Sequence, residues 1–458
     1  MREMNWVSIG SLVATGTLAA GLSACTPTPM MTGNCPTGGT PTDHHGVIPA
    51  DETWGAGIHT VTANVEVPTN LALTISPCAD VRLDPAVSIV VDADSHGLTA
   101  HGTAMQPIRF SRNGSSAWGA ITVRAPATVD LAYATLEGGG GADHLGATLV
   151  AIGASATPSA SLGVDHVTVQ GSTGLGLFVQ RTDFTAASNA LTVTGSGTQP
   201  VYLGAQWATN LPTGTYTGNG KDEFLFQSST AAGDANDDPI TRDATIRNRG
   251  IPYRVGAEGT GGTAIIVGDG RSETPGSTLT IEAGVTLRFE RQTSGESSVR
   301  VRAHRGIDGV TNVPQGVLIA HGTSDNPITF TSAAAVPAAA DWLGFYFEYI
   351  VDPNTSISHA VIQYAGGESA SNHICPSTPQ STNGDTDCSV VMFLDDMSAP
   401  AIGFITESSI EHAHCGIYRG WHNTPTDFLL TNHFFGIDGC LQTSVPNDQN
   451  QCVMCPTM

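Results

Sequence analysis

The chain has 458 residues, a formal net charge of −23 and only 13 % charged residues. Nucleic-acid binding needs clustered Lys and Arg side chains to contact phosphates, and Lys221 is the only lysine in the sequence, so this class of function is excluded. The chain contains 53 Gly and is also rich in Thr, Ser and Ala. Helical proteins use more Glu, Lys, Leu and Arg than this, so the composition predicts strands and turns.

Residues 1–24 are predicted to be a signal peptide, in which Arg2 precedes an uncharged apolar stretch that is too short for a membrane span. The stretch ends in Leu22-Ser23-Ala24-Cys25, which resembles the bacterial lipobox. The resemblance implies that Cys25 is lipidated and anchors the chain in a membrane. Thr26 stands where an Asp often marks inner-membrane retention, which favours the outer membrane or cell surface. The alternative is an ordinary secretory signal with an incidental Cys.

Residues 25–50 are predicted to be a flexible tether. Residues 26–43 are rich in Pro, Thr and Gly and poor in apolar side chains, a composition typical of linkers. The tether would separate the anchored Cys25 from a folded domain.

The chain has nine cysteines, of which eight remain if Cys25 carries lipid. An even number of cysteines in an exported protein predicts disulfides, although their connectivity stays open. The candidate pairs are Cys375–Cys388, Cys415–Cys440, Cys452–Cys455 and Cys35–Cys78.

The rest of the chain is an internal duplication. Short segments recur in the same order at a slowly drifting offset, which predicts a first copy over 51–230 and a second over 231–458. The matched segments include Leu73-Thr74-Ile75 with Leu279-Thr280-Ile281, Val81-Arg82-Leu83 with Leu287-Arg288-Phe289, residues 98–103 with 318–323, residues 131–138 with 357–364, and Thr182-Asp183-Phe184 with Thr426-Asp427-Phe428.

Each repeated segment is a short run of alternating apolar residues bounded by Gly, Pro, Asn or Asp. Strands this short cannot bury a face alone, whereas stacked coils can. The runs 279–289, 317–330, 341–344 and 357–366 resemble the bacterial right-handed parallel β-helix surface lipoproteins, whose fold is similar to that of pectate lyases. The resemblance implies an all-β right-handed parallel β-helix, continuous through both copies. A β-sandwich is the alternative, but it favours longer strands and tight hairpins.

The duplication also separates structural from functional candidates. A residue present in both copies is expected to serve the coil, whereas a residue present in one copy is free to serve something else. His101 and His321 are matched, so we interpret them as turn histidines that bond to backbone. Trp118 and Trp342 are likewise matched and are predicted to pack at a corner.

The second copy carries unmatched polar and aromatic residues. We predict Asp395, Asp396 and Glu411 as candidate catalytic carboxylates, because paired carboxylates can run acid–base chemistry on a sugar. The predicted ligand-binding residues are His412, His414, Tyr418, Trp421 and His422. On a strand, His412 and His414 would face the same side, as metal ligands can, but outward polar residues are ordinary on a β-helix and no metal site is predicted.

Two acidic clusters complete the candidates: Asp92 with Asp94, and Asp234 with Asp237 and Asp238. The second loosely resembles a calcium loop but lacks the glycine and the distal Glu of an EF-hand, so calcium is only a weak alternative to no cofactor.

Two functions remain. The first is a non-enzymatic surface protein that binds carbohydrate, adheres or supports the envelope, because solenoids offer extended binding surfaces. The second is a polysaccharide lyase or glycoside hydrolase acting on an extracellular glycan. The pair Asp395-Asp396 resembles part of the polygalacturonase pattern, but its Gly-His-Gly and Arg-x-Lys motifs are absent. A lyase would need a basic residue to abstract a proton, and no Lys or Arg stands in a recognisable motif, which favours the first function.

Overall fold

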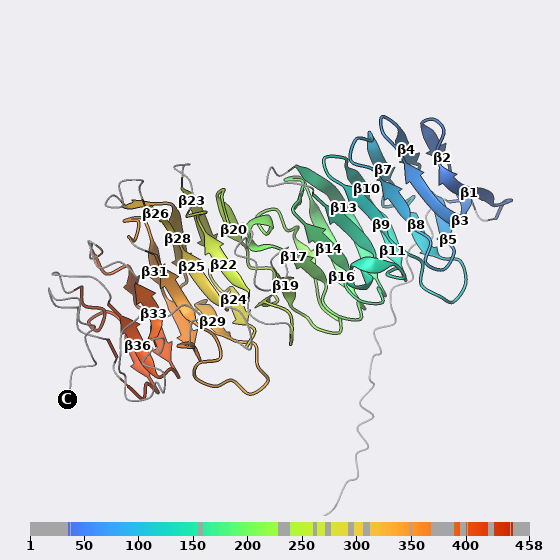
Figure 1. Ribbon diagram of the computed structural model, residues 1–458. Helices are drawn as coiled ribbons and strands as arrows, with labels where there is room; N and C mark the ends of the chain where they lie inside the picture. Colours follow the sequence, from blue (N-terminus) through green and yellow to red (C-terminus); the bar gives the residue numbers. More distant parts are fainter. Residues whose placement is uncertain are drawn as a thin grey trace, which may run out of the picture.

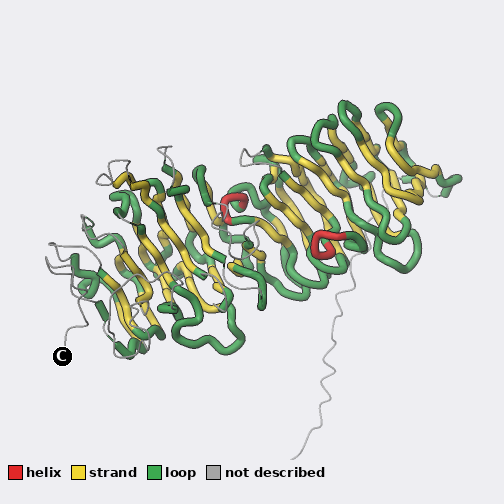
Figure 2. Tube along the Cα trace, viewed as in Figure 1, coloured by secondary structure: helices red, strands yellow, loops and turns green. Residues whose placement is uncertain are grey.

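The computed structural model describes residues 35–36, 38–153, 159–227, 239–259, 263–270, 276–291, 297–305, 312–348, 350–367, 389–393, 400, 402–419, 426–439 and 441–442. The described strands follow one another along one long axis, from β1 at one end to β36 near the other (Figure 1). Nearly all strand pairings are parallel, and loops join the strands around the edges of the stack (Figure 2). The chain is therefore a parallel β-helix, which confirms the all-β solenoid expected from the repeats.

Each coil of the first copy contributes strands to three parallel ladders. The first-strand ladder contains β2 (Glu52–Trp54), β4 (Ala72–Ile75), β7 (Gly97–His101), β10 (Val129–Ala132) and β15 (Asp183–Phe184). The second-strand ladder contains β5 (Ala79–Leu83), β8 (Ile108–Arg112), β11 (Ala134–Glu137), β16 (Asn189–Thr194) and β18 (Gly214–Thr215). The third-strand ladder contains β6 (Ile89–Val91), β9 (Ile121–Arg124), β12 (Leu149–Ile152), β14 (Leu177–Gln180), β17 (Val201–Leu203) and β19 (Phe224–Phe226). Three longer strands bridge two ladders: β1 (Thr42–Val47), β3 (Gly57–Val67) and β13 (Ala160–Gln170).

The second copy repeats this organisation. Its first strands are β20 (Ala244–Ile246), β23 (Ser277–Ile281), β28 (Gly316–His321), β31 (Ser356–Ser358) and β34 (Ile405–Thr406). Its second strands are β21 (Tyr253–Val255), β24 (Thr286–Phe289), β29 (Ile328–Ser332), β32 (Ala360–Gln363), β35 (Ser409–Glu411) and β37 (His433–Phe435). Its third strands are β22 (Ala264–Val267), β25 (Ser298–Val301), β30 (Gly344–Phe347), β33 (Ser389–Phe393) and β36 (Cys415–Tyr418). One antiparallel hairpin, β26 (Ala303–Arg305) with β27 (Asn312–Pro314), leaves the coil.

Helical structure in the described part of the chain is limited to two short segments. η1 (Ala205–Trp207) is a single 3-10 turn. α1 (Asp143–Gly146) is a tight loop rather than a helix, because His144 and Leu145 both have positive φ angles.

Alternation along the strands builds the core. In β5, Val81 and Leu83 are fully buried, while Arg82 between them points outward and binds Asp80. Coil after coil places such apolar side chains on top of one another, and they form one cluster that extends from Ile48 to Phe428. A strand of three to five residues is therefore stabilised by the coils above and below it.

The second copy is turned by one strand about the solenoid axis relative to the first. β5 and β24 carry matched sequence, and each is the second strand of its coil. However, β24 continues the third-strand ladder of the first copy, through the pairings β17–β19, β19–β21 and β21–β24. We call this ladder, which runs through both copies from β6 to β37, the long ladder. Matched residues of the two copies therefore face different sides of the solenoid.

Side-chain contacts support the matching of the two copies. The indole Nε1 of Trp118 donates to the carbonyl of Glu137 at 2.8 Å, and that of Trp342 donates to the carbonyl of Gln363 at the same distance. Both tryptophans are fully buried, which is the corner packing expected of them.

The matched histidines differ from expectation. Nε2 of His101 lies 2.8 Å from Oδ2 of Asp130, and Nε2 of His321 lies 2.7 Å from Oγ of Ser356. Both partners are side chains on the next coil, so the predicted bond to backbone is wrong. A histidine on an outward position reaches the neighbouring coil more directly than the turn because strands stack about 4.8 Å apart.

The first coils begin earlier than the predicted tether boundary at residue 50, since β1 pairs with β3 from Thr42 onward. The predicted disulfide Cys35–Cys78 is present, with the two Cα atoms 5.2 Å apart, and it ties the start of the described chain to the turn before β5. Residues 1–34, which include Cys25, lie outside the described residues. Among the described residues, no helix has the length and apolar character needed to cross a membrane.

The other predicted disulfides fall wholly or partly outside the described residues. Cys375, Cys388, Cys440, Cys452 and Cys455 are not described. Cys415 is buried on β36, and a Cβ placed on Gly439 would lie 3.2 Å from its sulfur, so Gly439 lies beside Cys415. The pairing Cys415–Cys440 stays a prediction.

Candidate functional site

The long ladder carries a row of outward side chains through the second copy. Ile362 and Ile410 fill the core, so Gln363 on β32 and Glu411 on β35 point to the outer surface. Gln363 and Glu411 are register partners, and Glu411 is in turn the partner of Phe435 on β37. The predicted residue Glu411 is thus one member of a row that crosses successive coils.

Glu411 is held by neutral hydrogen-bond donors. Nε2 of Gln363 donates to Oε2 of Glu411 at 2.7 Å, and the hydroxyl of Ser409 donates to Oε1 at 2.6 Å. Thr331 extends the row by donating to Oε1 of Gln363 at 3.3 Å. Bonds from both sides fix the orientation of the Gln363 amide, so the Glu411 carboxylate has a defined position and retains acceptor capacity.

The strand β35 ends at Glu411, and His412 has a φ angle of 54°. The expectation that His412 and His414 lie on one strand and face the same side is therefore wrong, because both lie in the turn before β36. The left-handed residue redirects the chain, which removes the alternation that the prediction assumed.

His412 instead belongs to an aromatic cluster. Its ring stacks on Tyr364 with centroids 5.1 Å apart and an angle of 9° between the ring planes, and it meets Phe435 edge to face at 5.4 Å. Phe435 is 65 % exposed, while Tyr364 and His412 are half-buried. We call Tyr364, His412 and Phe435 the aromatic corner. It borders the row formed by Thr331, Gln363 and Glu411.

The first copy has glycine at the positions of Tyr364 and His412. The N–H of Tyr364 donates to the carbonyl of Glu411, and the N–H of His412 donates to that of Phe435. In the first copy the same bonds are made by Gly138 and Gly171, which donate to the last strand residue of the next coil. All four residues have φ angles between 54° and 75°, the left-handed region that glycine adopts without strain.

The aromatic corner is therefore kept at an energetic cost. A side chain in the left-handed region costs about 1–2 kcal/mol per residue, which the first copy avoids with glycine. At the turn between first and second strands, both copies use residues other than glycine, such as Tyr133 and His359, so that turn does not distinguish them. We therefore interpret the strained side chains that only the second copy retains at this turn as candidate site residues.

The other predicted ligand residues do not join this corner. Nδ1 of His414 lies 3.6 Å from Oδ2 of Asp438, beyond hydrogen-bonding distance. Tyr418 lies on β36, in a different ladder from Glu411, and burial raises its pKa to about 12. Asp395, Asp396, Trp421 and His422 lie outside the described residues.

Four residues of the site, Thr331, Gln363, Tyr364 and Phe435, were not singled out in the sequence. For Tyr364 a signal was present, since the matched segments 131–138 and 357–364 already align Gly138 with Tyr364. Phe435 has no such signal, because its place beside His412 depends on how the last coil stacks.

No group of three or more metal-ligating side chains occurs in the described part of the chain. Of the acidic clusters, Asp92 binds Arg124 at 2.6 Å, which makes it a partner in an ion pair. Residues 234, 237 and 238 are not described.

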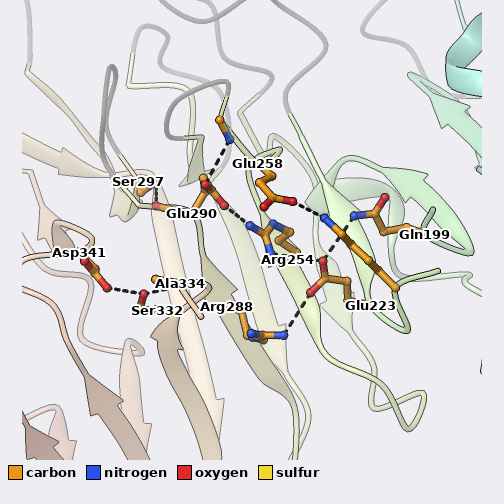
Figure 3. A network of polar contacts seen from close by, with 12 residues as sticks. Gln199, Glu223, Arg254, Glu258, Arg288, Glu290, Ser297, Ser332, Ala334 and Asp341 are labelled. Carbon is orange, nitrogen blue, oxygen red and sulfur yellow. Dashed lines mark hydrogen bonds and ion pairs between the residues drawn. The ribbon is translucent and has the colours of Figure 1, made fainter. Parts of the chain in front are cut away.

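A second polar network lies where the two copies meet (Figure 3). Arg254 on the long ladder is 7 % exposed and lies between Glu223 and Glu290, which are also buried. Arg288 binds the other oxygen of Glu223 at 3.3 Å, and Gln199 donates to Glu223. Because each buried carboxylate faces a guanidinium, the network is balanced in charge, and we interpret it as a structural element of the junction.

Comparison with known proteins adds no relative: no protein-family model, curated protein or solved structure matches the chain.

Proposed function

We propose that this chain is a lipid-anchored protein of the bacterial envelope or cell surface that binds a polysaccharide without cleaving it. The observation that carries the proposal is the aromatic corner, which places an exposed ring beside a fixed row of polar side chains. Glycan recognition combines these two elements, because a sugar offers an apolar ring face and a rim of hydroxyls. Tyr364 and His412 retain their side chains despite the backbone cost.

The sequence supports the anchored part of the proposal. Lipidation at Cys25 would hold the chain in a membrane, since acyl chains favour the bilayer by about 0.8 kcal/mol per buried methylene. The tether would then place the solenoid outside the outer membrane or cell surface. The second copy lies at the end of the stack opposite to β1, the first strand after the tether (Figure 1). A Cys25→Ser variant should move from the membrane fraction to the soluble fraction. Equal membrane association of both proteins would contradict the anchor.

The alternative function is a polysaccharide lyase or glycoside hydrolase. Glycoside hydrolysis needs two carboxyl groups on either side of the scissile bond. Among the described residues, the hydrogen-bond partners of Glu411 are the neutral side chains of Gln363 and Ser409. This arrangement favours a binding role for Glu411, whereas the enzymatic alternative depends on Asp395 and Asp396.

Binding and turnover are measured together on the full-length chain in detergent micelles. Affinity electrophoresis through gels that contain individual glycans detects binding, and assays for new reducing ends or unsaturated products detect cleavage. We expect retardation in at least one glycan gel with no product. Products that vanish in an Asp395→Ala, Asp396→Ala variant would establish the enzyme instead.

The site itself is tested by a double variant, Tyr364→Gly with His412→Gly, which restores the first-copy residues. Its retardation should fall by at least about tenfold, because the aromatic faces are lost while the backbone is relieved of strain. The matched control is Tyr133→Ala with His166→Ala, which removes the stacked pair of the first copy. A fall of the same size in the control would place binding elsewhere.

A further inference from the structure

Glu411 occupies the position at which a ligand on the aromatic corner meets the polar row. It directly precedes His412 in the chain, and its register partner on the next coil is the exposed Phe435. A sugar ring that lies on Phe435 would therefore have its hydroxyl rim beside the Glu411 carboxylate.

The hydrogen bonds of Glu411 determine what this carboxylate can accept. An ionised carboxylate offers about four lone-pair positions. Gln363 and Ser409 occupy one position on each oxygen, which leaves acceptor sites for further donors. Sugar hydroxyls are such donors. A uronate carboxylate or a sulfate ester offers only acceptors and negative charge, so it would face Glu411 without a hydrogen bond.

The surrounding charges act in the same direction. Asp438 lies in the turn that follows β37, and the chain as a whole carries a net charge of −23. Arg288 precedes Thr331 on the long ladder, but its guanidinium is engaged by Glu223. Nδ1 of His414 lies 3.6 Å from Oδ2 of Asp438.

We infer that Glu411 is the specificity-determining residue of the corner, and that it selects uncharged, hydroxyl-rich glycans against uronate-containing or sulfated ones. The inference rests on the proposed glycan-binding function. Like charges in contact repel even in bulk water by an amount equal to about a fivefold change in affinity, and by more near a protein surface.

The test compares the full-length wild-type chain with Glu411→Gln and a matched control, Glu407→Gln. Glu407 is 65 % exposed and pairs with His359 on another corner, so its substitution changes the net charge equally but leaves the row intact. Each protein is run through gels that contain a neutral β-glucan, a neutral α-glucan or polygalacturonate, at low and at high salt.

We expect wild type and Glu407→Gln to be retarded by a neutral glucan at least about fivefold more strongly than by polygalacturonate at low salt. High salt should narrow that difference, because it screens the repulsion. Glu411→Gln should gain retardation by polygalacturonate by about fivefold.

Wild-type binding to polygalacturonate as strong as to the neutral glucans would overturn the inference and leave the proposed function standing. The inference would also be overturned if Glu411→Gln kept the wild-type preference for neutral glucan over polygalacturonate. An equal gain in retardation by polygalacturonate in Glu407→Gln would overturn it too. Retardation by no glycan at all would remove the proposed function together with the inference. The salt dependence of the wild-type protein gives a second measure that needs no variant.

Discussion

The turn after the second strand differs between the two copies, although its backbone is the same. In the first copy the residue after the second strand is Gly138 in one coil and Gly171 in the next. In the second copy it is Tyr364 and then His412, with similar φ angles and the same backbone hydrogen bonds. The coil therefore needs a left-handed residue here and not a side chain. The first copy forms the same turn without the side chains of Tyr364 and His412. This is why we place the proposed ligand site at these two residues.

The same comparison has a counterpart in the core, where the copies should behave alike. Trp118→Ala and Trp342→Ala should each cost about 3–5 kcal/mol of stability, because each removes a fully buried indole and its hydrogen bond to a strand carbonyl. Urea unfolding of the two variants should agree within about 1 kcal/mol. A much milder effect in one copy would mean that the corner is not a shared feature of the coil.

The junction between the copies should be as sensitive as the core. Glu223→Gln removes the carboxylate that pairs with Arg288 and one of the two that pair with Arg254, so we expect a loss of about 3–5 kcal/mol in the free energy of unfolding. Glu258→Gln provides the control, because Glu258 is largely exposed and pairs with Lys221 at the surface. If Glu223→Gln is no worse than its control, the copies are not held together by this network.

A matched pair of aspartates gives a pH-dependent test. Asp183 is 3 % exposed, and burial raises its pKa from 3.8 to about 7, whereas the matched Asp427 is exposed. The raised pKa means that the folded state binds a proton more tightly than the unfolded state. Protonated Asp183 therefore contributes to the free energy of unfolding. This contribution is complete below pH 4 and is lost as the pH rises through about 7, by roughly 2–4 kcal/mol.

Unfolding measured from pH 5 to pH 8 should therefore show a decline in stability that Asp183→Asn largely removes. Asp427→Asn should leave the decline unchanged. The same slope in the wild type and in Asp183→Asn would show that Asp183 is not the titrating group.

The smallest expected effect concerns the glycine turn itself. Gly171→Ala should cost about 1–2 kcal/mol through backbone strain alone, because the nearest atoms to an added Cβ are 3.9 and 4.0 Å away. Tyr364→Gly should change stability by less than about 1 kcal/mol, since relief of strain offsets the lost ring stacking. Thermal or urea unfolding checks both. If Gly171→Ala were as stable as the wild type, this turn would accept a side chain without an energetic cost, and the second copy would not keep its aromatic residues at a cost.

The second copy is rotated by one strand about the solenoid axis, which places its repeated residues on a different side of the surface. A duplication without such a rotation would repeat the same residues along one face of the whole solenoid. Instead, the long ladder is formed by third strands in the first copy and by second strands in the second. Among the described residues the aromatic corner is therefore not repeated along that side, and a ligand bound there would contact one end of the stack.

The sequence by itself determined the elements. Alternating apolar residues, turn residues and the ordered repeats predicted a parallel β-helix, because inward and outward positions follow from a local period of two. It also predicted the pair Cys35–Cys78 and the placement of Glu411 and His412 in a distinctive part of the second copy.

Only the tertiary structure decided which residues become neighbours across coils. The stacking of one coil on the next brings Gln363 to Glu411 and His412 to Phe435. It also buries Asp183 but not Asp427. Stacking is set by the lengths of the loops between strands and by the one-strand turn at the junction. These are long-range properties that a local sequence pattern does not contain.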